Sequence, residues 1–199
     1  YTCIAMHPYY ETGWSRNLVY PHIGFDEMHF IDYFDQTKIL REYITDQELY
    51  DKIIKRYENR KNNEKLFFMG ITMQNHGGYT ETYDNFPENY YKVGRSYTDA
   101  NQYLSLVHES DEAVKNLISY FSKVDDPVEI IFFGDHQPSL NSNFYPILNG
   151  KGLTGLTEDE LEKLYTVPFF IWTNYDTPEE TVDITSLDYL STMALERAG

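Results

Sequence analysis

The apolar positions of the chain form short continuous runs of strand length, separated by segments with helical spacing. Three of these runs predict buried strands at Leu66–Met73, Val128–Phe133 and Val167–Thr173, and a fourth, Thr2–Met6, predicts a short strand at the start of the chain. None of them alternates polar with apolar residues. This pattern is typical of an α/β fold with a mostly parallel sheet that helices cover on both faces.

Capping residues predict where several helices begin. Ser15–Tyr20 predicts a helical turn that Pro21 and Gly24 stop. The sequences Thr45-Asp46-Gln47-Glu48 and Thr157-Glu158-Asp159-Glu160 are both capping boxes, in which a threonine and a glutamate three residues later satisfy each other's backbone donors. We therefore expect helices to begin directly after Thr45 and Thr157.

A long helix is predicted from about Tyr97 to Phe121, and a last helix begins after the capping segment Thr185-Ser186-Leu187-Asp188. In the long helix we expect an apolar stripe formed by Ala100, Leu104, Val107, Val114, Leu117, Ile118 and Phe121. In the last helix we expect three inward-facing residues: Leu187, Leu190 and Ala194.

The regular alternation of strands and helices, without repeats or linkers, predicts a single domain over residues 1–199. The chain opens directly on a buried strand and closes at a helix end. We therefore expect the C-terminal part of a larger domain, with its sheet incomplete because an N-terminal part is missing. No apolar run reaches the roughly 20 residues of a membrane span.

The net charge is −16, from 16 Lys and Arg against 32 Asp and Glu. Such a charge repels the phosphates of nucleic acids, so we expect no nucleic-acid partner. A phosphate or sulfate substrate would need a locally positive pocket made by an arginine or a metal ion. The single cysteine, Cys3, excludes an intrachain disulfide and a cysteine-rich zinc site.

Three of the six histidines follow predicted strands: His7 after the first, His76 after the second and His136 after the third. Ligands of parallel sheets bind beyond the carboxyl ends of the strands, so this edge is the candidate site. The other three histidines, His22, His29 and His108, have no evident convergent partner in the sequence, which favours surface or packing roles.

The segment Gly134-Asp135-His136 is the sharpest of these features. A glycine at a strand end permits a tight turn that presents a carboxylate and an imidazole to one point. Asp135 and His136 together suit Mn²⁺, Zn²⁺ or a similar divalent ion. The alternative is an ordinary turn in which Asp135 caps the following residues and His136 is merely exposed.

Two further loops carry candidate binding groups. In Asn75-His76-Gly77-Gly78 the glycines permit close approach of an anion, and His76 can donate to a phosphoryl oxygen or protonate a leaving group; the alternative is a plain surface loop. In the loop that follows His7, Arg16 offers a planar fork for phosphate or sulfate. Trp14 either lies against a glycerol or sugar moiety or covers the core.

Taken together, these segments resemble the extracellular domain of the lipoteichoic acid synthases, phosphoglycerol transferases of the sulfatase and alkaline phosphatase superfamily. The resemblance rests on ordered blocks that cover nearly the whole chain. These blocks are His7-Pro8-Tyr9 with Trp14-Ser15-Arg16, Gly24-Phe25-Asp26, Asn75-His76-Gly77, Phe133-Gly134-Asp135-His136 and the strand Val167-Pro168-Phe169-Phe170-Ile171-Trp172.

The resemblance implies a metal-dependent transfer of phosphoglycerol from phosphatidylglycerol to a cell-envelope polymer. Asp135 and His136 would be two ligands of a divalent metal, Mn²⁺ first and Mg²⁺, Zn²⁺ or Ca²⁺ as alternatives. His7, Trp14, Arg16 and His76 would line the phosphoglycerol pocket, with His76 as the catalytic residue. A metal-bound threonine would attack phosphorus and form a phosphoglyceryl-enzyme.

In this family the threonine and a glutamate ligand lie upstream of the first histidine block, so neither is in this chain, and we expect the fragment alone to be inactive. The resemblance places the parent protein on the extracellular face of a bacterial cytoplasmic membrane, anchored by upstream segments. Gln137 and Gly78 depart from the usual family pattern, which leaves the substrate open. The alternatives are a sulfatase or phosphoesterase that hydrolyses small esters, and a non-catalytic module that binds anionic wall polymers.

Overall fold

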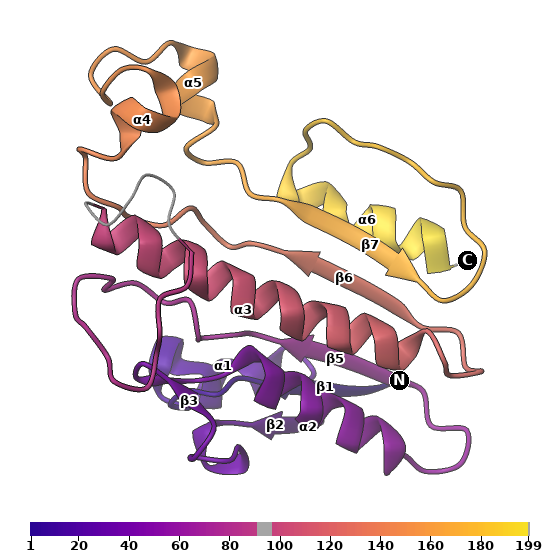
Figure 1. Ribbon diagram of the computed structural model, residues 1–199. Coiled ribbons are helices and arrows are strands. Elements are labelled where there is room, and N and C mark those ends of the chain that lie inside the picture. The colour runs from indigo at the N-terminus through magenta and orange to yellow at the C-terminus, as the bar shows by residue number, and fades with distance from the viewer. Residues whose placement is uncertain (91–96, 199) are drawn as a thin grey trace. The chain divides into compact units, whose positions relative to one another are not determined.

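The computed structural model describes residues 1–90 and 97–198, and the chain divides into two compact units (Figure 1). The first unit comprises Tyr1–Ile118 with Leu140–Phe144, and the second comprises Ser119–Ser139 with Tyr145–Gly199. The two units are described in turn.

The first unit is built on a parallel sheet in the order β2-β1-β5. Strand β1 (Thr2–Met6) lies in the middle and pairs in parallel with β2 (Glu27–His29) and β5 (Leu66–Gly70). Its residues Ile4, Ala5 and Met6 are all buried. The continuous apolar run at Thr2–Met6 thus reflects a central strand with both edges paired and both faces covered by helices.

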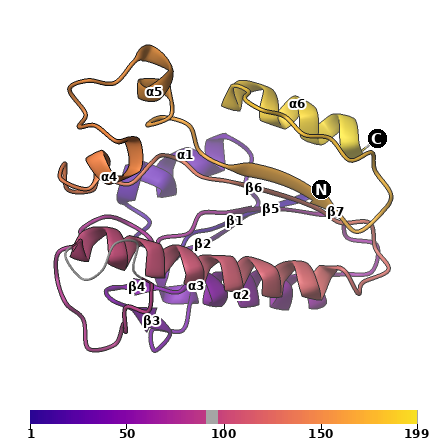
Figure 2. The same cartoon turned by 45° about the horizontal axis from the view of Figure 1, so that its top comes forward.

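Helices flank this sheet. Figure 2 shows α2 (Asp46–Glu58) and α3 (Thr98–Phe121) on one side and α1 (Arg16–His22) on the other. Helix α2 packs closely on β5, because a Cβ atom at Gly70 would lie 3.3 Å from Ile53 Cδ1. Helix α1 contains Pro21 within its last turn, so the expected stop at Pro21 is wrong and the helix ends one residue later, at His22.

Helix α2 begins as predicted, directly after Thr45, whose hydroxyl accepts the backbone N–H of Glu48. The reciprocal half of the predicted capping box is absent, because Glu48 uses its carboxylate elsewhere. It accepts the N–H of Asp35 at 2.9 Å and pairs with Lys52 at 3.3 Å. Tertiary contacts with the preceding loop therefore override the local capping pattern.

The first unit also contains short elements that no pattern predicted. Strands β3 (Ile39–Leu40) and β4 (Tyr43–Ile44) form an antiparallel hairpin with Arg41 and Glu42 at its turn. The single-turn helices are η1 (Gly13–Ser15) and η2 (Ile31–Tyr33). These elements lie in the segment between β1 and α2, where the sequence shows no periodicity.

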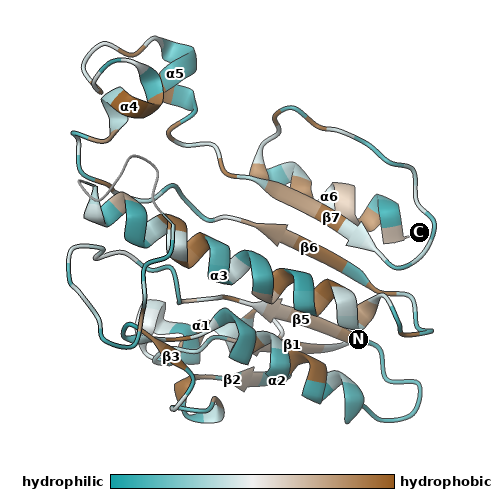
Figure 3. Ribbon diagram, in the orientation of Figure 1, coloured by the Kyte–Doolittle hydropathy of each residue, from teal (hydrophilic) through white to brown (hydrophobic). Residues whose placement is uncertain are grey.

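The predicted apolar stripe of α3 is confirmed at Ala100, Val114, Leu117 and Phe121, which are buried, and is wrong at Val107. Val107 is 38% exposed, whereas its neighbour Leu106 is fully buried among Tyr79 and Phe86. Polar residues also lie on the buried face of the helix: Asn101, Gln102, Ser105 and Ser110. Figure 3 shows this mixture of polar and apolar positions along α3. The polar face bonds to buried loop groups, so hydrophobic spacing alone misplaces it.

The second unit pairs β6 (Glu129–Phe133) with β7 (Phe169–Thr173) in antiparallel register. Asn174 closes the unit: its side-chain amide donates to the carbonyls of Phe121, Val124 and Asp126, and its Oδ1 accepts the N–H of Val128. One side chain thus ties the end of α3 to both strands of the pair.

Short helices complete the second unit: α4 (Tyr145–Asn149), α5 (Glu158–Glu162) and α6 (Leu187–Ala198). Helix α5 carries the predicted capping box in full, since Thr157 and Glu160 bond reciprocally. In α6, Leu190 and Ala194 are buried as expected, but Leu187 at the first helical position is 61% exposed.

The predicted α/β fold class, with a parallel sheet flanked by helices, is confirmed in the first unit. The pairing of β6 with β7 adds an antiparallel element to a fold expected to be mostly parallel. Within residues 1–90 and 97–198, no helix combines the length and apolar character needed to cross a membrane.

Substitution of Leu106 by alanine tests the corrected face of α3. Because Leu106 is fully buried, Leu106→Ala is expected to lower the free energy of unfolding by about 2–5 kcal/mol. Val107→Ala, on the exposed side of the same turn, is the control and should cost about 0.5 kcal/mol or less. Urea denaturation measures both variants, and equal losses would contradict the assignment.

Candidate functional site

The carboxyl edge of the parallel sheet carries three histidines of the first unit. His29 ends β2, His7 follows β1 directly, and His76 lies six residues beyond the end of β5. The backbone N–H of His7 donates to the carbonyl of His29 at 2.9 Å. His7 and His76 were expected at this edge, whereas His29 was not, because β2 is too short to show a pattern.

His29 has partners of its own. Its Nε2 lies 3.4 Å from a carboxylate oxygen of Glu27, and its ring stacks on Tyr33 with centroids 3.9 Å apart. His108 likewise pairs with Tyr90, whose hydroxyl lies 2.9 Å from His108 Nε2. These contacts are local and agree with the packing roles expected of both histidines.

His7 is buried, with 3% of its surface exposed. Its Nδ1 lies 2.9 Å from the carbonyl oxygen of Ile71, and a carbonyl can only accept, so Nδ1 carries the proton. Burial lowers the pKa of His7, and the positive charge of Arg16 lowers it further. The result is a neutral imidazole whose Nε2 is a hydrogen-bond acceptor.

Arg16 begins α1 and is held against the preceding turn. Its Nη1 donates to the carbonyl of Gly13 at 3.0 Å and its Nε donates to the hydroxyl of Tyr20 at 3.2 Å. Among the described residues, no protein group accepts from its Nη2, which leaves that amino group for a ligand. The guanidinium is thus positioned by the protein and still able to bind an anion.

Trp14 lies at the surface of the first unit, with 88% of its area exposed. The alternative in which Trp14 covers the core is therefore wrong. Trp14 and Ser15 both adopt the left-handed region, with φ of 56° and 52°. Such a conformation costs on the order of 1–3 kcal/mol per residue and is found mainly at functional sites.

His76 is exposed, and two tyrosine rings lie between it and His7. The ring centroid of Tyr9 lies 6.2 Å from that of His7 and 6.1 Å from that of Tyr43. Tyr43 then meets His76 edge-on at 5.6 Å, and its hydroxyl lies 3.3 Å from His76 Nδ1. The structure therefore brings His7 and His76 to one aromatic cluster. The sequence pattern included Tyr9 in the first family block without giving it a role, and it gave no signal for Tyr43.

A buried polar network holds the segment before His76. The amide of Gln74 accepts the N–H of Asp46 and donates to Ser110 on α3, and Ser110 donates to the Asp46 carboxylate. Burial raises the pKa of Asp46 to about 6, although these hydrogen bonds oppose the rise. Asp46 belongs to a capping pattern, so nothing in the sequence marks it as part of a site.

The second unit presents Gly134, Asp135 and His136 directly after β6. A Cβ atom at Gly134 would lie 3.1 Å from Val167 Cβ, so the position favours glycine because of close packing and not because of a positive φ. The side chains of Asp135 and His136 are 85% and 76% exposed, and their Oδ2 and Nε2 atoms lie 3.5 Å apart. The chain bends at Asp135 and His136 as expected, but the role of Gly134 is close packing against Val167 rather than freedom of the backbone.

This pair fits two positions of a metal shell. Oxygen and nitrogen donors lie about 2.1 Å from such an ion, so two donors of one ion are at most about 4 Å apart, and the observed 3.5 Å separation satisfies that limit. Among residues 1–90 and 97–198, no cluster of three or more His, Cys, Asp or Glu side chains could hold a metal ion. Asp135 and His136 are therefore at most part of a metal site.

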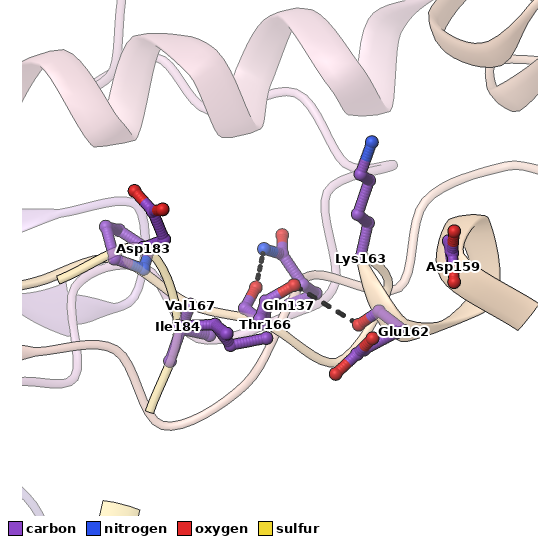
Figure 4. Close-up of a pocket in the computed structure, with 9 residues that line it drawn as sticks. Gln137, Asp159, Glu162, Lys163, Thr166, Val167, Asp183 and Ile184 are labelled. Atoms are coloured by element: carbon purple, nitrogen blue, oxygen red, sulfur yellow. Dashed lines mark hydrogen bonds between the residues drawn. The ribbon is translucent and has the colours of Figure 1, made fainter. Parts of the chain in front are cut away.

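Gln137 joins the loop after β6 to the segment before β7 by donating to the carbonyl of Thr166 (Figure 4). Beside this bond the second unit has an open hollow of about 520 Å³ whose lining mixes Lys163 with the carboxylates of Asp159, Glu162 and Asp183. This mixed charge does not favour an anion, and the hollow includes none of the predicted site residues.

The sulfatase family profile matches residues 1–199, the whole chain. The chain belongs to the sulfatase family. Its relatives include the capsular polysaccharide biosynthesis protein RkpI of Rhizobium meliloti, 33% identical over 69% of this chain and 24% of that protein. The lipoteichoic acid synthase of Staphylococcus saprophyticus is 30% identical over 68% of this chain and 21% of that protein.

Two solved structures show the same fold. The phosphoglycerol transferase GacH of Streptococcus pyogenes, in complex with sn-glycerol-1-phosphate, superposes with a TM-score of 0.76 at 21% identity, covering 98% of this chain and 49% of that one. The lipoteichoic acid synthase LtaP of Listeria monocytogenes gives 0.65 at 20% identity, covering 86% and 43%. This sulfatase-family chain spans a third or less of its curated relatives.

The close approach of Gly134 to Val167 predicts a packing defect in Gly134→Ala. Because the added methyl group would lie only 3.1 Å from Val167 Cβ and 3.3 Å from its Cγ1, Val167 has to shift, and we expect a loss of about 1–3 kcal/mol in the free energy of unfolding. Gly155→Ala is the control, since its Cβ would meet only Lys151 Cδ at 3.9 Å. Denaturation of both variants checks this, and equal stability would rule out the packing constraint.

The raised pKa of Asp46 predicts a pH-dependent stability. The folded state binds a proton at Asp46 up to a pKa of about 6, whereas the unfolded state releases it near 3.8, so this residue lowers stability as pH rises through that window. The loss is on the order of 3 kcal/mol. Asp46→Asn should remove this pH-dependent loss of stability, measured by denaturation at several pH values. Asp51→Asn, on the exposed side of α2, should retain the loss.

Proposed function

We propose that the full-length protein containing this chain transfers phosphoglycerol from phosphatidylglycerol to a cell-envelope polymer. The observation that carries the proposal is the gathering of His7, Arg16 and His76 at the carboxyl edge of the first unit's sheet, with Trp14 exposed beside Arg16. Membership in the sulfatase family, and likeness in fold to a phosphoglycerol transferase and a lipoteichoic acid synthase, support it.

Each of these residues has a role that its contacts suit. Arg16 binds the phosphoryl oxygens through Nη2, which has no acceptor among the described residues. His7, neutral and protonated at Nδ1, accepts a hydrogen bond from a glycerol hydroxyl at Nε2. Trp14 offers its exposed ring to the glycerol carbons. His76 donates to a phosphoryl oxygen or protonates the leaving diacylglycerol oxygen.

The phosphorus chemistry requires groups beyond these. Asp135 and His136 supply two ligands of a divalent cation, Mn²⁺ in first place, with Mg²⁺, Zn²⁺ or Ca²⁺ as alternatives. When bound, such a cation offsets negative charge and lowers the pKa of a coordinated hydroxyl. A threonine outside this chain attacks phosphorus and diacylglycerol leaves. A polymer hydroxyl then attacks the phosphorus of the phosphoglyceryl-threonine, so that the phosphoglycerol group passes to the polymer and the threonine is released.

The acceptor and location follow from the same proposal. Relatives named for lipoteichoic acid synthesis and for capsular polysaccharide biosynthesis favour an envelope polymer as acceptor. We place the protein on the extracellular face of a bacterial cytoplasmic membrane, held by segments outside this chain. The net charge of −16 argues against a nucleic-acid partner.

Release of diacylglycerol tests the proposal. The purified full-length protein, given Mn²⁺ and a fluorescent phosphatidylglycerol in detergent micelles, is expected to release fluorescent diacylglycerol. His76→Ala and Asp135→Ala should each lower the rate by about 100-fold or more, because one removes a proton donor and the other a metal ligand. His108→Ala, at the Tyr90 contact, is the matched control and should keep the wild-type rate.

Three results would contradict the proposal in different ways. Hydrolysis of an aryl sulfate or a simple phosphoester without lipid cleavage would replace the transferase by a sulfatase or phosphoesterase. If the protein cleaves none of the esters but binds an anionic wall polymer, a non-catalytic binding module would be favoured. Full activity of the isolated 199-residue chain would contradict the assignment of the nucleophile to another segment.

A further inference from the structure

Three backbone carbonyl groups of the loop Gln74–Gly78 accept hydrogen bonds from one buried side chain, that of Arg41. Nη2 of Arg41 donates to the carbonyls of Gln74 at 2.9 Å and His76 at 2.7 Å. Its Nη1 donates to the carbonyl of Gly78 at 3.2 Å. The guanidinium therefore binds the backbone on both sides of His76 and at His76 itself.

Arg41 is itself held through both of its Nη atoms, whereas its buried Nε has no hydrogen-bond partner among the described residues. It is only 5% exposed, and its Nη1 also donates to Gln102 Oε1 on α3 at 3.1 Å. Its guanidinium carbon lies 5.4 Å from the ring centroid of Tyr79 and 5.7 Å from that of Tyr43. Because Arg41 meets both α3 and the loop, the backbone of His76 is tied to the core of the unit.

The backbone at Arg41 is strained. Its φ of 55° lies in the left-handed region, at the first position of the two-residue turn between β3 and β4. Hairpin turns with this conformation prefer glycine there, which adopts it freely. An arginine persists at such a position only when the surroundings over-determine it, and its contacts with the His76 loop do so.

Tyr43, two residues along the same hairpin, reaches the imidazole. Its hydroxyl lies 3.3 Å from His76 Nδ1 and its ring meets the imidazole edge-on. Burial raises the pKa of Tyr43, which keeps the phenol protonated and able to donate. A donor at Nδ1 favours the neutral tautomer that carries its proton on Nε2.

We propose that the β3–β4 hairpin positions His76 for catalysis: Arg41 fixes the backbone of its loop, and Tyr43 holds its imidazole in the tautomer protonated at Nε2. This inference rests on the proposed function, in which His76 is the proton donor. Arg41 and Tyr43 act through His76 and are positioning residues. The hairpin places its two side chains on the backbone and the ring of one histidine, which a merely structural turn does not require.

The first test is spectroscopic and independent of turnover. In the full-length protein labelled with ¹⁵N in its histidine rings, the His76 signals are identified by their loss in His76→Gln. At a pH where the ring is neutral, the ¹⁵N shifts should show the proton mainly on Nε2. Tyr43→Phe should move population toward the Nδ1-protonated form. Tyr90→Phe, which removes an equivalent hydroxyl from His108, should leave the His76 signals unchanged.

The second test is kinetic, with diacylglycerol release as the readout. Tyr43→Phe and Arg41→Lys are expected to lower kcat by about tenfold or more and to change KM by less than about threefold, because a displaced proton donor loses transition-state interactions. Arg60→Met is the matched control: Arg60 lies 4.0 Å over the ring of Tyr57 and donates to its carbonyl, away from the His76 loop. It should keep the wild-type kcat.

The two tests separate the possible failures. An unchanged tautomer in Tyr43→Phe would overturn the role of Tyr43 whether or not the protein cleaves phosphatidylglycerol. A wild-type kcat in both hairpin variants would overturn the positioning role. If the full-length protein cleaves no ester, the proposed function fails and the tautomer measurement alone decides the hairpin's effect on His76. Arg41→Lys retains the charge, so a kcat loss in it points to the three carbonyl contacts.

Discussion

Backbone carbonyl groups that turn into the interior of a protein must find donors there, and the loop after β5 is shaped by this requirement. Arg41 binds the carbonyls of Gln74, His76 and Gly78, and the hydroxyl of Tyr79 donates to that of Asn75. Because these donors are buried and shared with α3, the loop cannot move without breaking several bonds at once. An exposed imidazole is thus carried on a rigid support.

The same requirement explains the polar composition of the buried face of α3. Gln102 and Ser110 meet Arg41 and the Gln74–Asp46 network. Apolar residues at these positions would remove one acceptor from Arg41, one acceptor from each of the side-chain amides of Gln74 and Asn75, and the hydroxyl donor of Asp46. Losing buried hydrogen bonds costs more than the burial of apolar groups would return. Stability and site geometry therefore depend on the same side chains, and Leu106 supplies the apolar contacts between them.

An acidic chain whose proposed substrate is a phosphate ester has to concentrate positive charge locally. Arg16 lies at the sheet edge close enough to lower the pKa of His7, and it leaves one amino group available among the described residues. In the second unit, Asp135 and His136 offer paired oxygen and nitrogen donors at the end of β6. The residues proposed to bind the anion and those proposed to bind a metal thus belong to different compact units of one sulfatase-family chain.

Local sequence determined the elements whose signal is short-ranged. The apolar runs marked β1, β5, β6 and β7, and the capping box at Thr157 marked the start of α5, because burial and capping act within a few residues. Only the tertiary structure placed Arg41 and Tyr43 at His76 and moved the buried position of α3 from Val107 to Leu106. The contacts of Arg41 and Tyr43 with His76 join residues more than 30 positions apart, and those of Leu106 with Tyr79 and Phe86 join residues 20 or more positions apart. Neither hydrophobic spacing nor local capping rules carry that information.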